Sequence, residues 1–134
     1  MSVEQGGRAQ SFLAFDFGAK RTGVASGNTI TRSATPLRTI HAESAAARFA
    51  AVEKLIREYQ PDALVVGVPR HPDGAPHDNT HRAQRFARQL HGRFRLPVHE
   101  VDERYTSTEA EAAGARDLDA ASAALILEQF LRQA

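Results

Sequence analysis

The run ALVVGV at residues 63–68 is the feature that most constrains the fold of this chain. It is short, apolar and rich in β-branched residues, which is typical of a strand buried on both faces of its sheet. Pro61 precedes the run, and the following loop at 69–76 contains three prolines and a glycine, so regular structure stops on both sides. We therefore expect a central buried strand with helices packed against it.

The segments around this run follow two different hydrophobic periods. Residues 11–17 and 22–26 read as short strands joined by a turn at 18–21, and a weaker third strand, disturbed by Pro36, is expected within 29–40. Beyond them the apolar period becomes helical. Helices are predicted at 43–60, around 83–90, at 107–113 and at 119–132, with a further strand at 98–103. Hairpins followed by alternating strands and helices predict an α/β fold with a mixed sheet.

Length and composition suggest one domain in a reducing compartment. The 134 residues suit a single domain at 11–134 preceded by a flexible tail at 1–10. There is no cysteine, which excludes disulfides and thiolate metal sites. The polar start lacks the apolar stretch of a signal peptide, and no apolar run approaches the roughly 18 residues needed to span a bilayer. We expect a cytoplasmic protein without a membrane partner.

The net charge of +1 does not by itself indicate a nucleic-acid partner, but the charges are unevenly distributed. No acidic residue lies between Asn79 and His99, and this stretch contains Arg82, Arg85, Arg88, Arg93 and Arg95. The next segment, 100–119, holds seven acids and two arginines. This pattern suits a protein that attracts phosphates with one surface and holds cations with another. Taken alone, the arginines are better explained as a solvated helix face.

Candidate catalytic acids occur in three places along the chain. Asp16 ends the first strand, the adjacent Asp102 and Glu103 end the last strand, and Asp119 begins the last helix. Each has an ordinary explanation, as a turn-bonding aspartate, a solvated strand end paired with Arg104, or a helix N-cap. Two strand ends and a helix start on one mixed sheet can nevertheless converge. Clustered carboxylates repel one another unless a cation lies between them, and hard divalent cations prefer such oxygen ligands.

The acidic pair is constrained further by strand geometry. Adjacent strand residues point to opposite faces, so at most one of Asp102 and Glu103 faces a given site, and the sequence leaves open which one is the ligand. We predict Asp16, Glu103 and Asp119 as metal ligands, with Asp102 completing the catalytic set. The predicted cofactor is Mg²⁺ or Mn²⁺, as two ions roughly 4 Å apart that act on a phosphodiester.

Four blocks of this sequence resemble, in order, four blocks of the YqgF/RuvX family. They are FDFGAKRTGVA at 15–25, VVGVPRHPDG at 65–74, VDERYTSTEA at 101–110 and LDAASAALILE at 118–128. The resemblance extends from Phe12 to Leu131, nearly the whole chain. It implies an RNase H-like fold with a five-stranded mixed sheet, three antiparallel strands and then two parallel ones, and helices on both faces. It also implies a nuclease that processes the 5′ end of pre-16S rRNA; an older label for the family is Holliday junction resolvase.

The resemblance also implies roles for individual residues. The family's acids match Asp16, Asp102, Glu103 and Asp119, its basic pair matches Lys20 and Arg21, and a hydroxyl pair matches Thr106 and Ser107. The predicted substrate-binding residues are Lys20, Arg21, Arg104, Thr106 and Ser107. The segment at 109–118 is shorter than in many relatives, which removes any substrate contact that a longer loop would make.

Several other functions are weaker interpretations of the same sequence. A four-way DNA junction resolvase would usually need a symmetric dimer. A sugar-kinase-like or actin-like ATP binder would need two domains, for which this chain is too short. A non-catalytic RNA-binding ribosome-assembly factor would not need the acids.

His77 and His81 have a spacing that is compatible with zinc binding but no third ligand, so we reject a zinc site. The expected partners are nucleic acid, with pre-16S rRNA before branched DNA, and ribosomal precursor particles.

Overall fold

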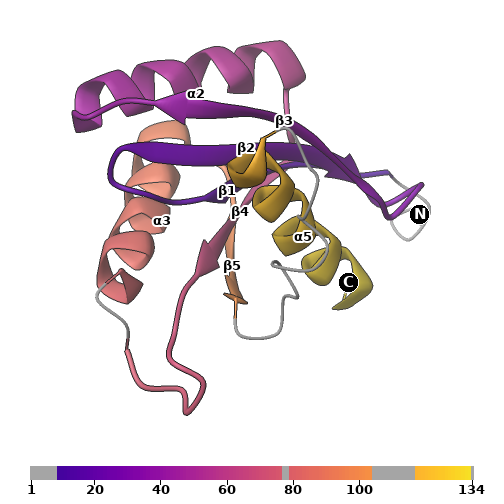
Figure 1. The fold of residues 1–134 in the computed structure, drawn as a ribbon. Helices are drawn as coiled ribbons and strands as arrows, with labels where there is room; N and C mark the ends of the chain where they lie inside the picture. The colour runs from indigo at the N-terminus through magenta and orange to yellow at the C-terminus, as the bar shows by residue number, and fades with distance from the viewer. Residues whose placement is uncertain (1–8, 77–78, 104–116, 134) are drawn as a thin grey trace.

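The computed structural model describes residues 9–76, 79–103 and 117–133, which form a sheet covered by helices on both faces (Figure 1). The strands are β1 (Ser11–Asp16), β2 (Arg21–Asn28), β3 (Ala34–His41), β4 (Ala63–Val68) and β5 (Val98–Asp102). The helices are α2 (Ala45–Tyr59), α3 (Thr80–Phe94) and α5 (Leu118–Gln133). The strands form one mixed sheet in the order β3-β2-β1-β4-β5.

The strand directions confirm the predicted RNase H-like arrangement. The first three strands form an antiparallel meander, in which β1 pairs with β2 and β2 pairs with β3. Strand β4 then pairs with β1 in parallel, and β5 pairs with β4 in parallel. Because β1, β4 and β5 run in the same direction, their carboxyl ends meet at one edge of the sheet. Asp16 and Asp102 end two of these strands at that edge.

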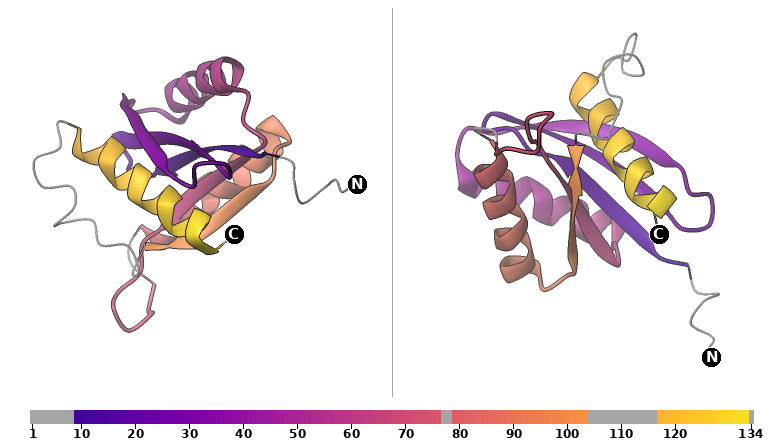
Figure 2. Two further views of the ribbon diagram at one scale, coloured as in Figure 1. Left: turned by 90° about the vertical axis from the view of Figure 1, so that its right-hand side faces the viewer. Right: turned by 90° about the horizontal axis from the view of Figure 1, so that it is seen from below.

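The two faces of the sheet pack against different helices (Figure 2). On one face, Phe15 of β1 joins a cluster that includes Phe49 of α2 and Phe86 of α3. On the other face, Phe12 of β1 packs with Leu127 of α5 and other buried residues. Side chains alternate between the faces along a strand, so Asp16, four residues after Phe12, lies on the α5 face. The predicted buried strand at 63–68 has all six residues buried.

Some predicted boundaries differ from the structure. The third strand is a complete edge strand that pairs with β2 despite Pro36, which aligns with Ala25 beside a register shift. An edge position tolerates proline because only one side of the strand needs ladder hydrogen bonds. Strand β5 ends at Asp102, one residue earlier than predicted. The helix predicted at 107–113 lies outside the described residues.

Helix α5 begins with a cap made by Asp117, not by Asp119. The Asp117 Oδ1 atom accepts a hydrogen bond from the Ala120 backbone N–H at 3.0 Å and another from the Thr39 hydroxyl of β3. Partial burial would raise the pKa of Asp117, but these hydrogen bonds and one from the Asp119 N–H together lower it. The cap therefore ties the start of α5 to the sheet and leaves the Asp119 carboxylate available for other contacts.

Most of the predicted N-terminal tail, 1–10, lies outside the described residues. The backbone oxygen of Gln10 accepts a hydrogen bond from the Thr29 N–H at 3.0 Å, and the Gln10 N–H donates to the Thr29 hydroxyl.

In the described part of the chain, no helix combines the length and apolar character required to cross a membrane.

The cap predicts a measurable difference between two neighbouring acids. Replacing Asp117 with Ala should lower the free energy of unfolding by about 1 kcal/mol, because the cap to Ala120 is lost. Asp119→Ala removes the same charge from the same helix turn without removing the cap, so it should cost clearly less. Urea unfolding of both variants checks this. An equal loss for the two would show that charge at the helix start, and not the cap, stabilises α5.

Candidate active site

Asp16 lies between two glycines at the carboxyl end of the central strand, β1. Its Cα partners are Gly23 on β2 and Gly67 on β4. A Cβ atom at Gly23 would overlap the backbone carbonyl of Asp119, so the first turn of α5 rests directly on this point of the sheet. The absence of a side chain at Gly23 is therefore what brings Asp119 next to Asp16.

The Glu103 side chain approaches Asp16 from the β4 side of β1, opposite Gly23. A Cβ atom added at Gly67 would lie 3.0 Å from the Glu103 Cγ and 3.1 Å from its Cδ, and would overlap Ile126. Gly67 pairs with Val101, and Glu103, two residues later, lies on the same face of the sheet. The Glu103 side chain thus occupies the space above Gly67, the β4 neighbour of Asp16.

Asp102 takes the opposite face. Its Cα partner is Val68, whose side chain belongs to the core cluster formed with α2 and α3. The register therefore separates the acidic pair: Glu103 shares the face of Asp16 and Asp119, whereas Asp102 does not. Asp102 still acts through space, because its charge contributes to raising the pKa of Glu103.

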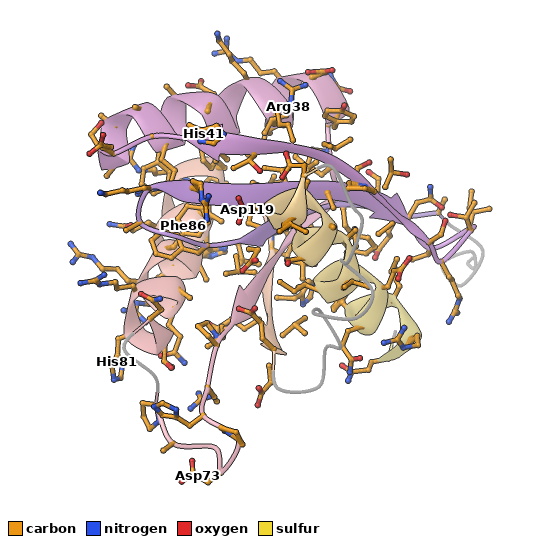
Figure 3. The ribbon with its side chains drawn as sticks, in the orientation of Figure 1. Arg38, His41, Asp73, His81, Phe86 and Asp119 are labelled. Atoms are coloured by element: carbon orange, nitrogen blue, oxygen red, sulfur yellow. The ribbon has the colours of Figure 1, made fainter. Side chains whose placement is uncertain are left out.

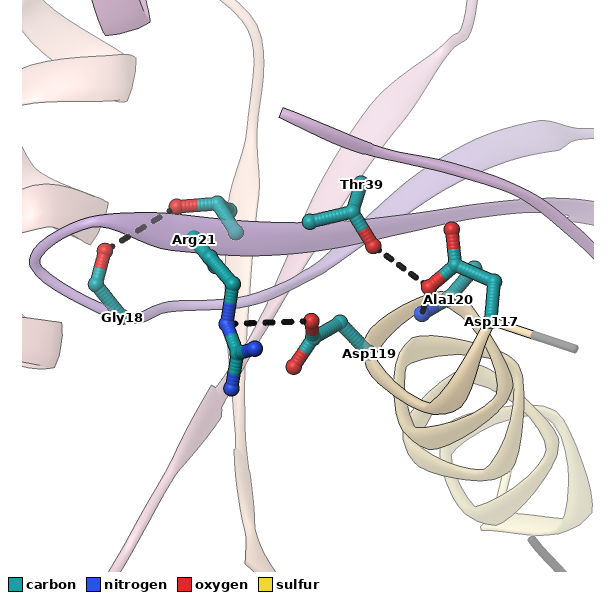
Figure 4. Close-up of polar contacts among 7 residues, drawn as sticks. Gly18, Arg21, Thr39, Asp117, Asp119 and Ala120 are labelled. Carbon is teal, nitrogen blue, oxygen red and sulfur yellow. Dashed lines mark hydrogen bonds and ion pairs between the residues drawn. The ribbon is translucent and has the colours of Figure 1, made fainter. Parts of the chain in front are cut away.

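Asp119 contacts Arg21 at the end of the turn 18–21 between β1 and β2. We call this turn the basic turn because it contains Lys20 and Arg21. The Arg21 Nε lies 3.5 Å from the Asp119 Oδ2, with the two side chains 65% and 30% exposed (Figure 4). At this exposure the pair contributes little stability, roughly 0–1 kcal/mol. The turn is tight, since a Cβ at Gly18 would overlap the Arg21 carbonyl, and the Thr22 hydroxyl donates to the Gly18 oxygen at 3.2 Å.

An open pocket of about 500 Å³ lies at the end of β1, lined by Asp16 and Asp119 but not by Glu103. Its lining consists of Asp16, Phe17, Gly18, Ala19, Lys20, Arg21 and Asp119. We call it the acidic pocket. The predicted basic pair, Lys20 and Arg21, is exposed on its rim. Carboxylates at the base and cations at the rim suit a ligand that carries both a metal ion and a negatively charged phosphate.

Burial and mutual repulsion disfavour the charged forms of two of the acids. Burial, with a further contribution from the Asp119 charge, raises the pKa of Asp16 to about 6. Burial, and then the charges of Asp16 and Asp102, raise the pKa of Glu103 to about 8. A cation bound between these carboxylates would reverse both effects, because an opposite charge favours the ionised form. Hard oxygen donors of this kind are the chemistry that Mg²⁺ and Mn²⁺ require.

The acids do not form a closed metal cage. Across 9–76, 79–103 and 117–133, no group of three or more His, Cys, Asp or Glu side chains is arranged to hold a metal ion by itself. Mg²⁺ does not need such a cage, because it commonly binds through one or two carboxylates and keeps waters or substrate phosphates as its other ligands. The pair Asp16 and Glu103 fits this open mode, with Asp119 beside it.

Sequence reasoning missed some contributors to the site and predicted others that the structure does not describe. Arg104, Thr106, Ser107 and His77 lie outside the described residues. Gly23 and Gly67 were not singled out, although a glycine inside a predicted strand is a signal of close backbone approach. Arg48 was also missed. It is buried on α2, and its guanidinium donates to the Ala19 carbonyl in the basic turn.

Comparison with known proteins identifies the relatives of this chain. The family model described as "RuvX: Holliday junction resolvase" matches residues 10–133. A protein of Polaromonas sp. named "Putative pre-16S rRNA nuclease" is 68% identical over 92% of this chain and 88% of its own length. A protein of Albidiferax ferrireducens with the same name is 66% identical, over 92% of this chain and 78% of its own length.

A solved structure supports the fold independently. Thermus thermophilus RuvC, in complex with a Holliday junction substrate, superimposes with a TM-score of 0.61 at 13% identity. The match covers 92% of this chain and 94% of RuvC. At this identity the likeness shows a shared fold, which agrees with the strand order seen here.

The raised pKa of Glu103 predicts a pH-dependent stability. In the unfolded chain this carboxyl ionises near 4.5, whereas in the metal-free fold it keeps its proton to about pH 8. The folded state therefore binds more protons over this range, and the free energy of unfolding should fall as the pH rises from 4.5 to 8. Glu103→Gln, which stays neutral, should flatten this fall.

Urea unfolding between pH 5 and pH 8 in the presence of a chelator measures the effect. The matched control is Glu100→Gln, which removes a carboxylate from an exposed position of β5, the strand that Glu103 directly follows, and should keep the wild-type pH dependence. An unchanged pH dependence in Glu103→Gln would contradict the electrostatic picture of the site.

Proposed function

We propose, because this chain belongs to the RuvX family, that it is a divalent-metal-dependent nuclease that hydrolyses phosphodiester bonds. The observation that carries the proposal is the convergence of Asp16, Glu103 and Asp119 on one face of the sheet, beside an exposed basic turn. Acids from two strands and a helix, which are distant in sequence, meet only because the fold brings them together. No purely structural role requires Asp16 to be buried where it repels both Glu103 and Asp119.

In this proposal each group has a defined task. Asp16 and Glu103 are the principal metal ligands, and Asp119 completes the set from α5. A divalent cation held there would lower the pKa of a bound water and stabilise the charge that develops on the phosphate oxygens. Mg²⁺ or Mn²⁺ is the expected cofactor, with two ions in the full site. Lys20 and Arg21 on the rim hold the substrate phosphate, and Arg21 is released from Asp119 for this purpose.

The substrate we favour is the 5′ end of pre-16S rRNA, alone or within a ribosomal precursor particle in the cytoplasm. This choice is supported by the names of relatives that are 68% and 66% identical to this chain. Cleavage of four-way DNA junctions is the second candidate, and it is supported by the family description and by the junction bound to RuvC. A junction enzyme would have to act as a symmetric dimer in order to cut two strands.

The test is metal-dependent cleavage of two substrates by matched variants. Wild-type protein with Mg²⁺ or Mn²⁺ should cut a pre-16S 5′ fragment, and chelation should stop the reaction. Asp16→Asn and Glu103→Gln should each reduce kcat by at least about 100-fold, the upper end of what losing a residue that supports a bound metal costs. Glu100→Gln, on the same strand as Asp102 but exposed, should keep activity.

The outcomes separate the candidate functions. Cleavage of the DNA junction but not of the RNA would indicate that the chain is a junction resolvase. Binding of the RNA without cleavage under any metal would indicate a non-catalytic assembly factor. Equal cleavage by wild type and Asp16→Asn would contradict the catalytic assignment itself.

A further inference from the structure

A second pocket lies on the other side of the end of β1. It has a volume of about 270 Å³ and opens between α2 and α3. Its lining consists of Phe17, Ala45, Arg48, Arg82, Arg85, Phe86 and Gln89. We call it the arginine pocket. Phe17 lines both this pocket and the acidic pocket, so the two are separated by little more than the chain at the end of β1.

Its position is fixed by contacts around Phe17. The rings of Phe17 and Phe86 lie 5.0 Å apart, which anchors the end of β1 to α3. Figure 3 shows Phe86 on α3 and Asp119 on α5 along the stretch of β1 and β2 that leads into their connecting turn. The arginine pocket therefore lies beside the acidic pocket, on the opposite face of the sheet.

The charged side chains that line the arginine pocket are all positive. Arg48 is 8% exposed, donates a hydrogen bond to the Ala19 carbonyl and lies 5.1 Å from the centre of the Phe17 ring. Arg82 and Arg85 are exposed and lie three residues apart, on the same side of α3. Within the described ranges, none of these three guanidinium groups is paired with a carboxylate.

The buried guanidinium of Arg48 is incompletely compensated. Buried charges in proteins are normally paired, because removing them from water is costly. Burial lowers the pKa of Arg48, and the carbonyl and the aromatic ring that it contacts carry no net negative charge. Ala45, the first residue of α2, also lines the pocket, and the first turn of this helix contains no acid. The positive end of the helix dipole therefore adds to an already positive pocket.

We propose that the arginine pocket binds a backbone phosphate of the same nucleic-acid strand whose neighbouring phosphodiester lies in the acidic pocket. The inference rests on the proposed nuclease function for the identity of the strand. Guanidinium groups suit this task because their planar fork of donors matches the geometry of phosphate oxygens. A strand that passes Phe17 would contact both pockets, so the arginines would hold the substrate in register with the acids.

A purely structural role for Arg48 is the competing explanation, and the choice of variants separates the two. Arg48→Gln removes the charge and shortens the side chain that reaches the Ala19 carbonyl, so urea unfolding of this variant is measured beside its binding to show whether the fold is kept. Arg82→Ala and Arg85→Ala change exposed residues and should leave folding intact. Arg88→Ala is the matched control, because Arg88 lies on the same helix but lines a different pocket, with His91 and Glu100.

Binding is measured in an Asp16→Asn background, which prevents cleavage, by fluorescence anisotropy across a range of salt concentrations. The ligands are the pre-16S 5′ fragment and, separately, a four-way DNA junction. Each of Arg48→Gln, Arg82→Ala and Arg85→Ala should reduce the slope of log K against log salt by up to about 1, the loss expected when one phosphate contact disappears completely. Arg88→Ala should keep the parent slope. A reduction with only one ligand would identify which type of backbone the pocket binds.

Two results would overturn the inference. Unchanged slopes for the three variants with both ligands would show that the pocket binds no phosphate. Equal reductions by all four variants, Arg88→Ala included, would show that the arginines act only as a diffuse positive surface.

Kinetics separate this inference from the proposed function. In the protein with Asp16 intact, Arg82→Ala should raise KM for the nucleic acid and leave kcat unchanged. Hydrolysis of bis(p-nitrophenyl) phosphate, which is too small to reach both pockets, should be unaffected.

Wild-type protein that cleaves neither the RNA nor the DNA junction would refute the nuclease proposal, and the salt slopes would still show whether the arginine pocket binds phosphate. Normal cleavage with an unchanged KM in Arg82→Ala would refute the pocket alone.

Discussion

The structure depends on the close approach of α5 to the centre of the sheet. This approach is possible because Gly23 leaves the space that the Asp119 backbone occupies, and Gly67 leaves the space that Ile126 and Glu103 occupy. The Asp117 cap and its hydrogen bond to Thr39 hold the helix start in that position. Side chains at either glycine would lift α5 and separate the acids. The same packing that completes the core therefore also assembles the site.

In the assembled site the carboxylates repel one another, and a bound cation would reduce this repulsion. Asp16 and Glu103 both have raised pKa values because they are buried close to other carboxylates. Arg21 offsets the charge of Asp119 only from an exposed position. A divalent cation would satisfy the acids, and phosphate would satisfy the basic turn, so the two would bind cooperatively. On the other face, Arg48 is a buried cation with no carboxylate partner among the described residues. In our proposals, the two pockets on either side of Phe17 would bind different parts of one metal-phosphate ligand.

Much of this arrangement could be predicted from the sequence, and the rest could not for identifiable physical reasons. The buried run at 63–68 and the hydrophobic periods around it predicted the order of the elements and a mixed sheet, and the family resemblance predicted the strand directions and the helices on both faces. The candidate acids came from their positions at strand ends and a helix start, and the resemblance matched the same residues. Strand alternation predicted that Asp102 and Glu103 would face opposite sides, but only the pairing of Gly67 with Val101 shows that Glu103 shares the face of Asp16. The role of Asp117 as the cap of α5 and the burial of Arg48 depend on contacts between distant elements, which no local pattern contains.

The central claim is that Asp16 and Glu103, with Asp119 beside them, bind a divalent cation whose other ligands are waters or substrate phosphate. Paramagnetic broadening by Mn²⁺ in NMR spectra tests it most directly, because the effect reports proximity to the ion without requiring activity. Substoichiometric Mn²⁺ should first broaden the signals of Asp16, Gly67, Glu103 and Asp119, and excess Mg²⁺ should restore them. Broadening that begins instead at exposed acids such as Glu53 and Glu58 of α2, with the site signals unchanged, would contradict the claim.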